Sequence, residues 1–123
     1  MNELCFTHQI LVPDNAEKVR QADGYFDELS DAAVFSFTQD EYDLLRRNGG
    51  LFDIFDRRFG TIIDDCEEDR ILEADIDKAL KYTCEFLSGI SDPAECAAVT
   101  RVREALQYAK DCSVFCEFVN GLE

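Results

Sequence analysis

Eight carboxylates within one short stretch are the residues of this sequence with the clearest potential for chemistry. They lie in IIDDCEEDRILEADIDKAL, residues 62–80, where only Arg70 and Lys78 oppose them. Carboxylates at this density can bind a divalent cation, transfer protons or recognise a basic protein. A solvated acidic surface is the simplest alternative. The eight are Asp64, Asp65, Glu67, Glu68, Asp69, Glu73, Asp75 and Asp77.

Metal binding is the first of these chemistries that the spacing disfavours. A calcium loop needs alternating acids, glycine at its sixth position and glutamate at its twelfth. Counted from Asp64, the sixth residue is Asp69 and the twelfth is Asp75. Zinc is disfavoured too, because a strand would hold Cys112 and Cys116 roughly 13 Å apart. We therefore expect no metal and no cofactor, and only a looser divalent-cation site stays open.

Catalysis is disfavoured by the lack of a recognisable constellation. His8 is the single histidine, and its strand-like surroundings are typical of a partly buried structural residue. The sequence has no Gly-x-Ser-x-Gly elbow, no phosphate-binding glycine loop and no dinucleotide-binding fingerprint. Two carboxylates with separated pKa values can act as acid and base, but a sequence does not reveal such environments. We predict that the protein is not an enzyme.

The charge balance favours recognition of a basic protein. Lys and Arg total 12 against 27 Asp and Glu, which gives a net charge of −15. Nucleic acid and anionic membrane surfaces are disfavoured partners, since both require a basic surface. Opposite fields would steer a basic partner instead. We expect the contact residues to be Asp64, Asp65, Glu67, Glu68 and Asp69, with Asp53 and Asp56 as a second group.

The size and composition of the chain predict one domain over residues 1–123. Hydrophobic residues make up 46% of the chain, which suffices for a packed core. The first residues lack the pattern of a signal peptide, and no apolar run reaches the roughly 18 residues of a membrane helix. We expect a cytoplasmic protein.

The elements that must position these residues follow from hydrophobic periodicity and capping signals. Thr38 and Glu41 have the spacing of a capping box, and Asp92-Pro93 marks another helix start. The apolar pieces TIIDD (61–65) and RIL (70–72), on either side of the acidic cluster, are left open between brief strands and an irregular loop. The expected strands are Leu4–Val12, Ala32–Thr38 and Cys112–Val119, and the expected helices are 16–22, 38–47, 51–59, 74–87 and 93–110. This order predicts an α+β fold with helices packed on a small mixed β-sheet.

The middle of the chain also resembles a known class of proteins. The similar features are the FT-x-x-E helix start, the segment GLFDIFDRRFG and the acidic turn IDDCEED, all within residues 35–69. They resemble small acidic bacterial immunity proteins of polymorphic toxin systems. The resemblance implies a cytosolic inhibitor that binds one toxin domain and blocks its active site or a vital surface. It implies no catalytic residue.

The leading functional hypothesis is therefore an immunity protein that neutralises a cognate toxin by stoichiometric occlusion. Two alternatives stay open. One is a nucleic-acid mimic, in which spaced carboxylates replace phosphates and occupy a DNA-binding protein. The other is an uncharacterised small enzyme.

The six cysteines provide a first test of the expected compartment. They are scattered along the chain, and cytosolic thiols remain reduced. We expect the mass of freshly purified protein, measured without reductant, to correspond to six free thiols. A mass deficit equivalent to two or more native disulfides would contradict the cytosolic assignment. The cysteines are Cys5, Cys66, Cys84, Cys96, Cys112 and Cys116.

Overall fold

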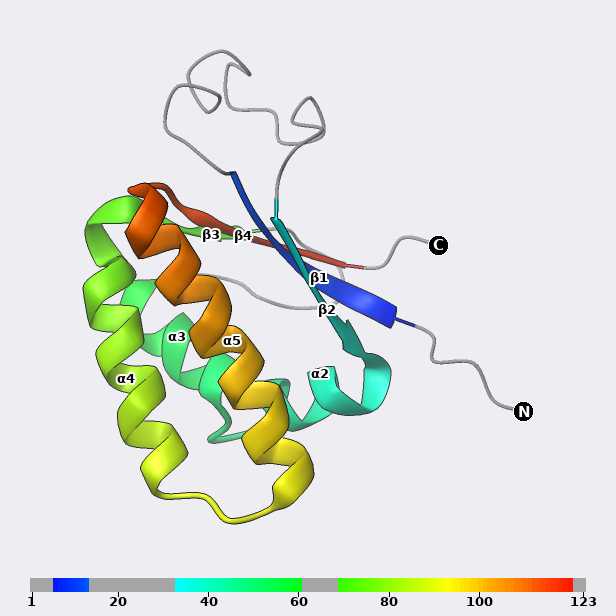
Figure 1. Cartoon of the computed structure of the whole chain (residues 1–123). Helices are drawn as coiled ribbons and strands as arrows, with labels where there is room; N and C mark the ends of the chain where they lie inside the picture. Colours follow the sequence, from blue (N-terminus) through cyan, green and yellow to red (C-terminus); the bar gives the residue numbers. More distant parts are fainter. Residues whose placement is uncertain (1–5, 14–32, 61–68, 121–123) are drawn as a thin grey trace.

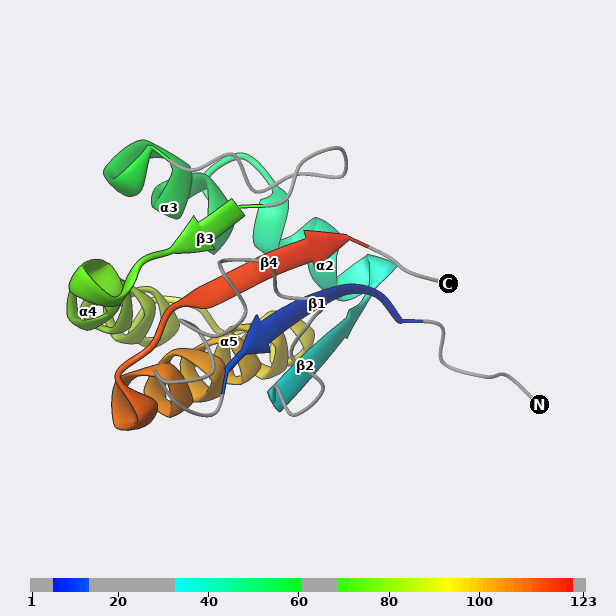
Figure 2. The same cartoon turned by 90° about the horizontal axis from the view of Figure 1, so that it is seen from above.

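A four-stranded antiparallel sheet with helices on one face forms the body of the protein (Figures 1 and 2). The computed structural model describes residues 6–13, 33–60 and 69–120. The strands are β1 (Phe6–Val12), β2 (Ala33–Thr38), β3 (Asp69–Ile71) and β4 (Cys116–Asn120). The helices are α2 (Gln39–Arg46), α3 (Leu51–Phe59), η2 (Glu73–Asp75, a 3₁₀ turn), α4 (Ile76–Ser88) and α5 (Pro93–Cys112). The predicted α+β class is confirmed.

The predicted mixed sheet is wrong for the described strands, because every pairing among them is antiparallel. The strand order is β2-β1-β4-β3. Leu11 pairs with Val34 on one side and with Glu117 on the other, and Glu117 also pairs with Arg70. Hydrophobic alternation identifies strands but does not encode their direction, which is why the sequence did not reveal that the sheet is antiparallel. The expected helix at 16–22 lies outside the described residues.

The sheet buries one face against the helices. Ile10 and Val12 of β1 are almost fully buried together with Phe37 of β2. Leu11, between them, belongs to the opposite face, where its neighbour Val34 is 52% exposed. This alternation has the period of two that a half-covered antiparallel sheet requires.

Helix α2 begins with the predicted capping box. The backbone N–H of Glu41 donates to the Thr38 hydroxyl at 3.2 Å, and the Thr38 N–H donates to the Glu41 carboxylate at 2.9 Å. These two bonds satisfy backbone donors that an uncapped helix start leaves unpaired. They also fix the sharp transition from β2 into α2.

The paired glycines at 49 and 50 separate α2 from α3 for a steric reason. Gly49 has φ +82°, in the left-handed region that favours glycine. A Cβ on Gly50 would lie 2.7 Å from the Leu45 carbonyl oxygen, so no side chain fits there. Helix α3 then runs to Gly60, whose left-handed conformation (φ +72°) ends it.

Aromatic rings attach α3 to the sheet. Phe52 and Phe55 are buried on its inner face, as their spacing predicts. The Phe52 ring lies 5.4 Å from that of Phe118 in β4, in an edge-to-face arrangement. Phe55 contacts the same ring at 6.5 Å between centroids. Such pairs stabilise a core beyond the area they bury.

Helix α5 is the longest element and crosses the sheet, with α4 alongside it (Figure 1). Asp92 caps it by accepting a hydrogen bond from the Glu95 N–H at 2.9 Å, as predicted. Its inner face is made of small residues that are fully buried. They are Ala98, Val99, Val102, Ala105 and Ala109, with Leu106 beside them.

The predicted strand at Cys112–Val119 begins four residues too early. Helix α5 continues to Cys112 and ends at Ser113, which adopts the left-handed conformation with φ 59°. The Ser113 N–H donates back to the helix at Lys110, and β4 starts only at Cys116. The residues after Lys110 are of types that favour strands, so the sequence placed the start of the last strand too early. The true end of α5 depends on the left-handed conformation of Ser113, which the sequence does not reveal.

No helix within the described ranges combines the length and apolar character needed to cross a membrane.

The close packing of α5 can be tested with two leucines on the same helix. Ala105 is fully buried, whereas Ala97 is exposed on the outer face. We expect Ala105→Leu to lower the free energy of unfolding by about 1–3 kcal/mol, because extra methylenes overpack a filled core. Ala97→Leu adds the same volume and should change it by less than about 0.5 kcal/mol. Urea denaturation measures both, and equal losses would contradict the packing described.

Candidate functional site

The acidic cluster of the sequence lies mostly beyond the part of the chain that the structure describes. Asp64, Asp65, Glu67 and Glu68 are outside it, and Asp69 enters as the first residue of β3, opposite Phe118. The strand that follows provides a fixed attachment, since it pairs with β4 along its three residues. Asp69 therefore lies in an edge strand of the sheet.

The second predicted contact group is held by arginines of the same chain. The Asp53 carboxylate accepts from Arg57 at 2.7 Å and from the Gly49 N–H at 2.8 Å. Asp56 lies 3.4 Å from Arg46. Both side chains are about one-fifth exposed. These bonds give Asp53 and Asp56 a structural role in joining α2, the glycine turn and α3.

Two buried carboxylates are also paired with arginines. Glu95 in α5 accepts from Arg47 at 2.6 Å, and Glu117 in β4 accepts from Arg70 at 2.7 Å. The Arg70 guanidinium further lies 4.2 Å above the Phe115 ring. A buried carboxylate without such a partner would be strongly destabilising. Neither glutamate is arranged to meet an external ligand.

Arg101 connects α5 to β2 and α2. It donates to the Ser36 carbonyl oxygen at 3.0 Å and to the Glu41 carboxylate at 2.9 Å, and its guanidinium lies 5.3 Å from the Phe37 ring centroid. Partial burial raises the pKa of Glu41, but donors from Thr38 and Arg101 outweigh it and hold the pKa below the ordinary 4.5. Glu41 is therefore ionised at neutral pH and completes both the helix cap and the ion pair.

His8 and Cys116 are both buried. The His8 ring stacks on Tyr42 with centroids 3.5 Å apart. The buried Cys116 thiol donates to the Ala105 carbonyl oxygen at 3.6 Å. Burial raises the pKa of Cys116, so the thiol is protonated at neutral pH and is a poor nucleophile.

The described residues hold no group of three or more His, Cys, Asp or Glu side chains that can coordinate a metal ion. Cys84, Cys96, Cys112 and Cys116 are free thiols. Cys112 ends α5 and Cys116 begins β4, so they do not share the single strand that the sequence predicts.

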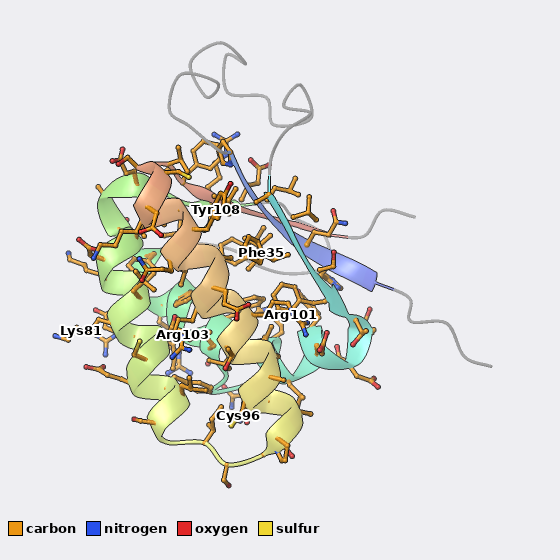
Figure 3. All side chains as sticks on the ribbon, in the orientation of Figure 1. Phe35, Lys81, Cys96, Arg101, Arg103 and Tyr108 are labelled. Atoms are coloured by element: carbon orange, nitrogen blue, oxygen red, sulfur yellow. The ribbon has the colours of Figure 1, made fainter. Side chains whose placement is uncertain are left out.

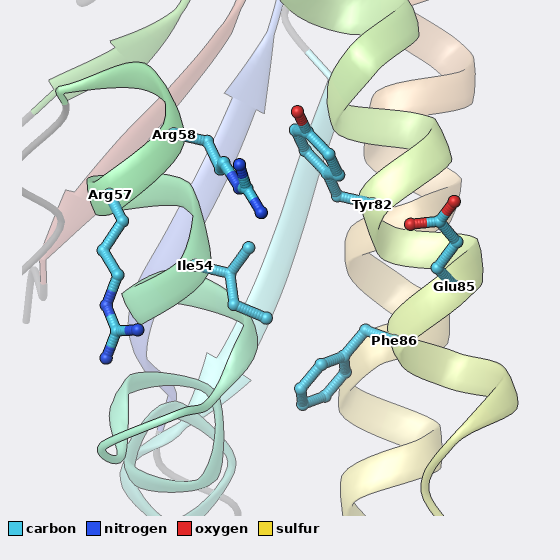
Figure 4. A pocket seen from close by; sticks show the side chains of 6 residues that line it. All are labelled: Ile54, Arg57, Arg58, Tyr82, Glu85 and Phe86. Atoms are coloured by element: carbon cyan, nitrogen blue, oxygen red, sulfur yellow. The ribbon is translucent and has the colours of Figure 1, made fainter.

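The surface feature that sequence reasoning missed is a pocket between α3 and α4 (Figure 4). It has a volume of about 550 Å³, within the range of ligand-binding clefts. Helix α3 contributes Ile54, Arg57 and Arg58, while α4 contributes Tyr82, Glu85 and Phe86. Each set has the i, i+3, i+4 spacing of one helix face. That spacing is readable in the sequence, but only the tertiary structure places the two faces opposite each other.

Apolar, aromatic and charged side chains all line this pocket. Arg58, Ile54, Tyr82 and Phe86 point into the gap between the helices, whereas Arg57 points away from it (Figure 4). The Arg58 guanidinium lies 5.4 Å from the Tyr82 ring centroid. Tyr82 in turn contacts Phe59 at 5.8 Å between ring centroids. The pocket thus offers an apolar floor with a cation at its side.

Comparisons with protein-family models, curated proteins and solved structures found no match to this chain. The resemblance to immunity proteins therefore stays a prediction.

The Glu41 carboxylate yields a prediction for the pH dependence of stability. A folded-state pKa below the unfolded value stabilises the fold fully above about pH 4.5, and this contribution is lost as the pH falls through the folded pKa. Glu41→Gln should lower the free energy of unfolding at pH 7 and flatten its decline between pH 5 and 3.

Glu104→Gln is the matched control, because Glu104 is exposed on α5 and has no ion pair with any described residue. Urea denaturation at pH 7, 5, 4 and 3 measures the three proteins. If Glu41→Gln and Glu104→Gln give the same curves, the Glu41 ion pair contributes nothing to stability.

Proposed function

We propose that this protein is a cytoplasmic acidic binding protein that neutralises a cognate toxin by stoichiometric occlusion. The supporting observation is how its charge is distributed. Residues 6–13, 33–60 and 69–120 hold 15 of the 27 Asp and Glu residues but 10 of the 12 Lys and Arg residues. Two-thirds of the net charge of −15 thus belongs to the other segments, which include Asp64–Glu68.

The ion pairs of the described body sharpen this contrast. Arginines of the same chain hold the carboxylates of Glu41, Asp53, Asp56, Glu95 and Glu117, and Lys110 lies 3.0 Å from Asp77. Carboxylates that are already paired add little to the attraction of a basic partner. We therefore assign the contact to Asp64, Asp65, Glu67, Glu68 and Asp69 and leave Asp53 and Asp56 with their structural role.

The proposed mechanism is electrostatic steering followed by occlusion. Five acids within six positions repel one another, which disfavours the compact state of the free protein. Binding to a basic partner would relieve this repulsion. Their field attracts Lys and Arg side chains of the toxin and raises the association rate. Asp69, the last residue of the cluster, pairs with Phe118 of β4 and thus belongs to the edge strand β3. The bound protein then covers a working surface of the toxin.

The test removes four charges while preserving side-chain shape. We expect the variant Asp64→Asn, Asp65→Asn, Glu67→Gln, Glu68→Gln to associate at least about tenfold more slowly with the cognate toxin at low salt. Its association rate should depend less on salt, because steering charges are gone. The free energy of binding should become less favourable by about 2–5 kcal/mol if these carboxylates form desolvated ion pairs at the centre of the interface. Surface plasmon resonance at two salt concentrations measures these quantities.

The matched control removes four exposed carboxylates elsewhere, at Asp40, Asp43, Glu104 and Asp111. Equal effects of both quadruple variants would indicate a general charge effect and contradict a local contact. Unchanged kinetics in the first variant would also contradict it. If the captured partner is a DNA-binding protein that DNA displaces from the complex, the nucleic-acid-mimic alternative replaces the toxin assignment.

A further inference from the structure

Helices α3, α4 and α5 carry cations that the rest of the body does not neutralise. Among the described residues, six of the Lys and Arg side chains pair with carboxylates. Within the same ranges, the four without a carboxylate partner are Arg58, Lys78, Lys81 and Arg103. All four are on α3, α4 or α5, which is unexpected in a protein with a net charge of −15.

Arg58 differs from the other three because it lies in an aromatic pocket. Its side chain points between α3 and α4, toward Tyr82, and the pocket also includes Ile54 and Phe86 (Figure 4). Lys81 and Arg103 instead border the shallow surface between α4 and α5 (Figure 3). Arg57, beside Arg58 in sequence, is held by Asp53 at 2.7 Å. Arg58 is thus the cation of this pocket that is available to a ligand.

We propose that the pocket between α3 and α4 is a docking site for a peptide segment that carries a carboxylate beside an aromatic side chain. The carboxylate pairs with Arg58, and the aromatic ring packs among Ile54, Tyr82 and Phe86. Two helix faces with matched i, i+3, i+4 residues form an open groove, the geometry that receives short peptide segments. The site uses none of the residues assigned to toxin contact and does not depend on the toxin assignment.

The charge distribution selects this occupant over other anions. Nucleic acid and anionic membranes extend far beyond one arginine and would meet the strongly negative remainder of the protein. A short peptide meets only the pocket and its rim. Among the residues that line the pocket, Arg57 is held by Asp53, and Glu85 is the carboxylate that opposes the charge of Arg58. The pocket accordingly favours an acidic peptide that carries an aromatic side chain.

The experiment titrates the full chain, labelled with ¹⁵N, with three blocked tetrapeptides and follows amide chemical shifts. The probes are N-acetyl-Phe-Glu-Glu-Phe-amide, its Phe-Lys-Lys-Phe analogue and its Ala-Glu-Glu-Ala analogue. We expect saturable shifts in α3 and α4 with the first probe only, and weaker binding at higher salt. Shifts from the lysine peptide of equal size, shifts outside these helices or no shifts at millimolar peptide would overturn the proposal.

Three single variants are expected to change peptide binding in three different ways. Arg58→Gln should weaken binding of the acidic aromatic peptide about fivefold, the loss expected for one exposed ion pair. Glu85→Gln should strengthen it by removing a repulsive carboxylate from the pocket. Arg103→Gln removes the same charge as Arg58→Gln but lies outside the pocket, so it should leave binding unchanged.

Thermal melting of each variant verifies folding, and all three positions are solvent-accessible. Equal weakening by Arg58→Gln and Arg103→Gln would show that the peptide senses overall charge and would overturn the pocket assignment. A pocket that fails this test leaves the toxin-binding proposal unaffected, since the latter is measured with a different partner and different residues.

Discussion

The close approach of helix α5 to the sheet is the constraint on which the rest of the structure depends. Its inner face carries alanines and valines that are fully buried, so its backbone lies near the strands. The bond from the Cys116 thiol to the Ala105 carbonyl oxygen shows this proximity, because a strand side chain there reaches the helix backbone. Helices α2 and α4 then pack on α5. Larger residues on this face would separate the two layers.

Partly buried ion pairs orient the elements around that contact. Arg47 joins the end of α2 to α5 through Glu95, and Arg101 joins α5 to α2 and β2 through Glu41 and Ser36. Each pair contributes modestly in net terms, since desolvation offsets much of the attraction. Their geometric effect is larger, because loss of one partner leaves a charge in a poorly solvated place. They also neutralise much of the described body and leave most of the net charge to other parts of the sequence.

The excess of negative charge outside the described body and the Arg58 cation in the pocket are features of opposite charge in one small protein. We propose that the acidic segments attract a basic partner over long range and that the pocket between α3 and α4 binds an acidic, aromatic group. A protein that uses both would combine fast encounter with a specific short-range contact. The two surfaces depend on different residues, so each can be altered without the other.

Local signals in the sequence determined much of the secondary structure. The capping box at Thr38, the Asp92-Pro93 start and the Phe repeat of α3 act within one or two helical turns, and each element formed as expected. The sheet direction, the end of α5 at Ser113 and the ion pair between Glu95 and Arg47 were not predictable in this way. They depend on contacts between distant segments or on one residue's conformation. The sequence by itself therefore determined the elements, the excess of negative charge and the α+β class, because these follow from local periodicity and composition. Only the tertiary structure decided that Glu95 and Glu117 are paired with Arg47 and Arg70 and that the faces of α3 and α4 form a pocket, since both require residues far apart in the chain to meet.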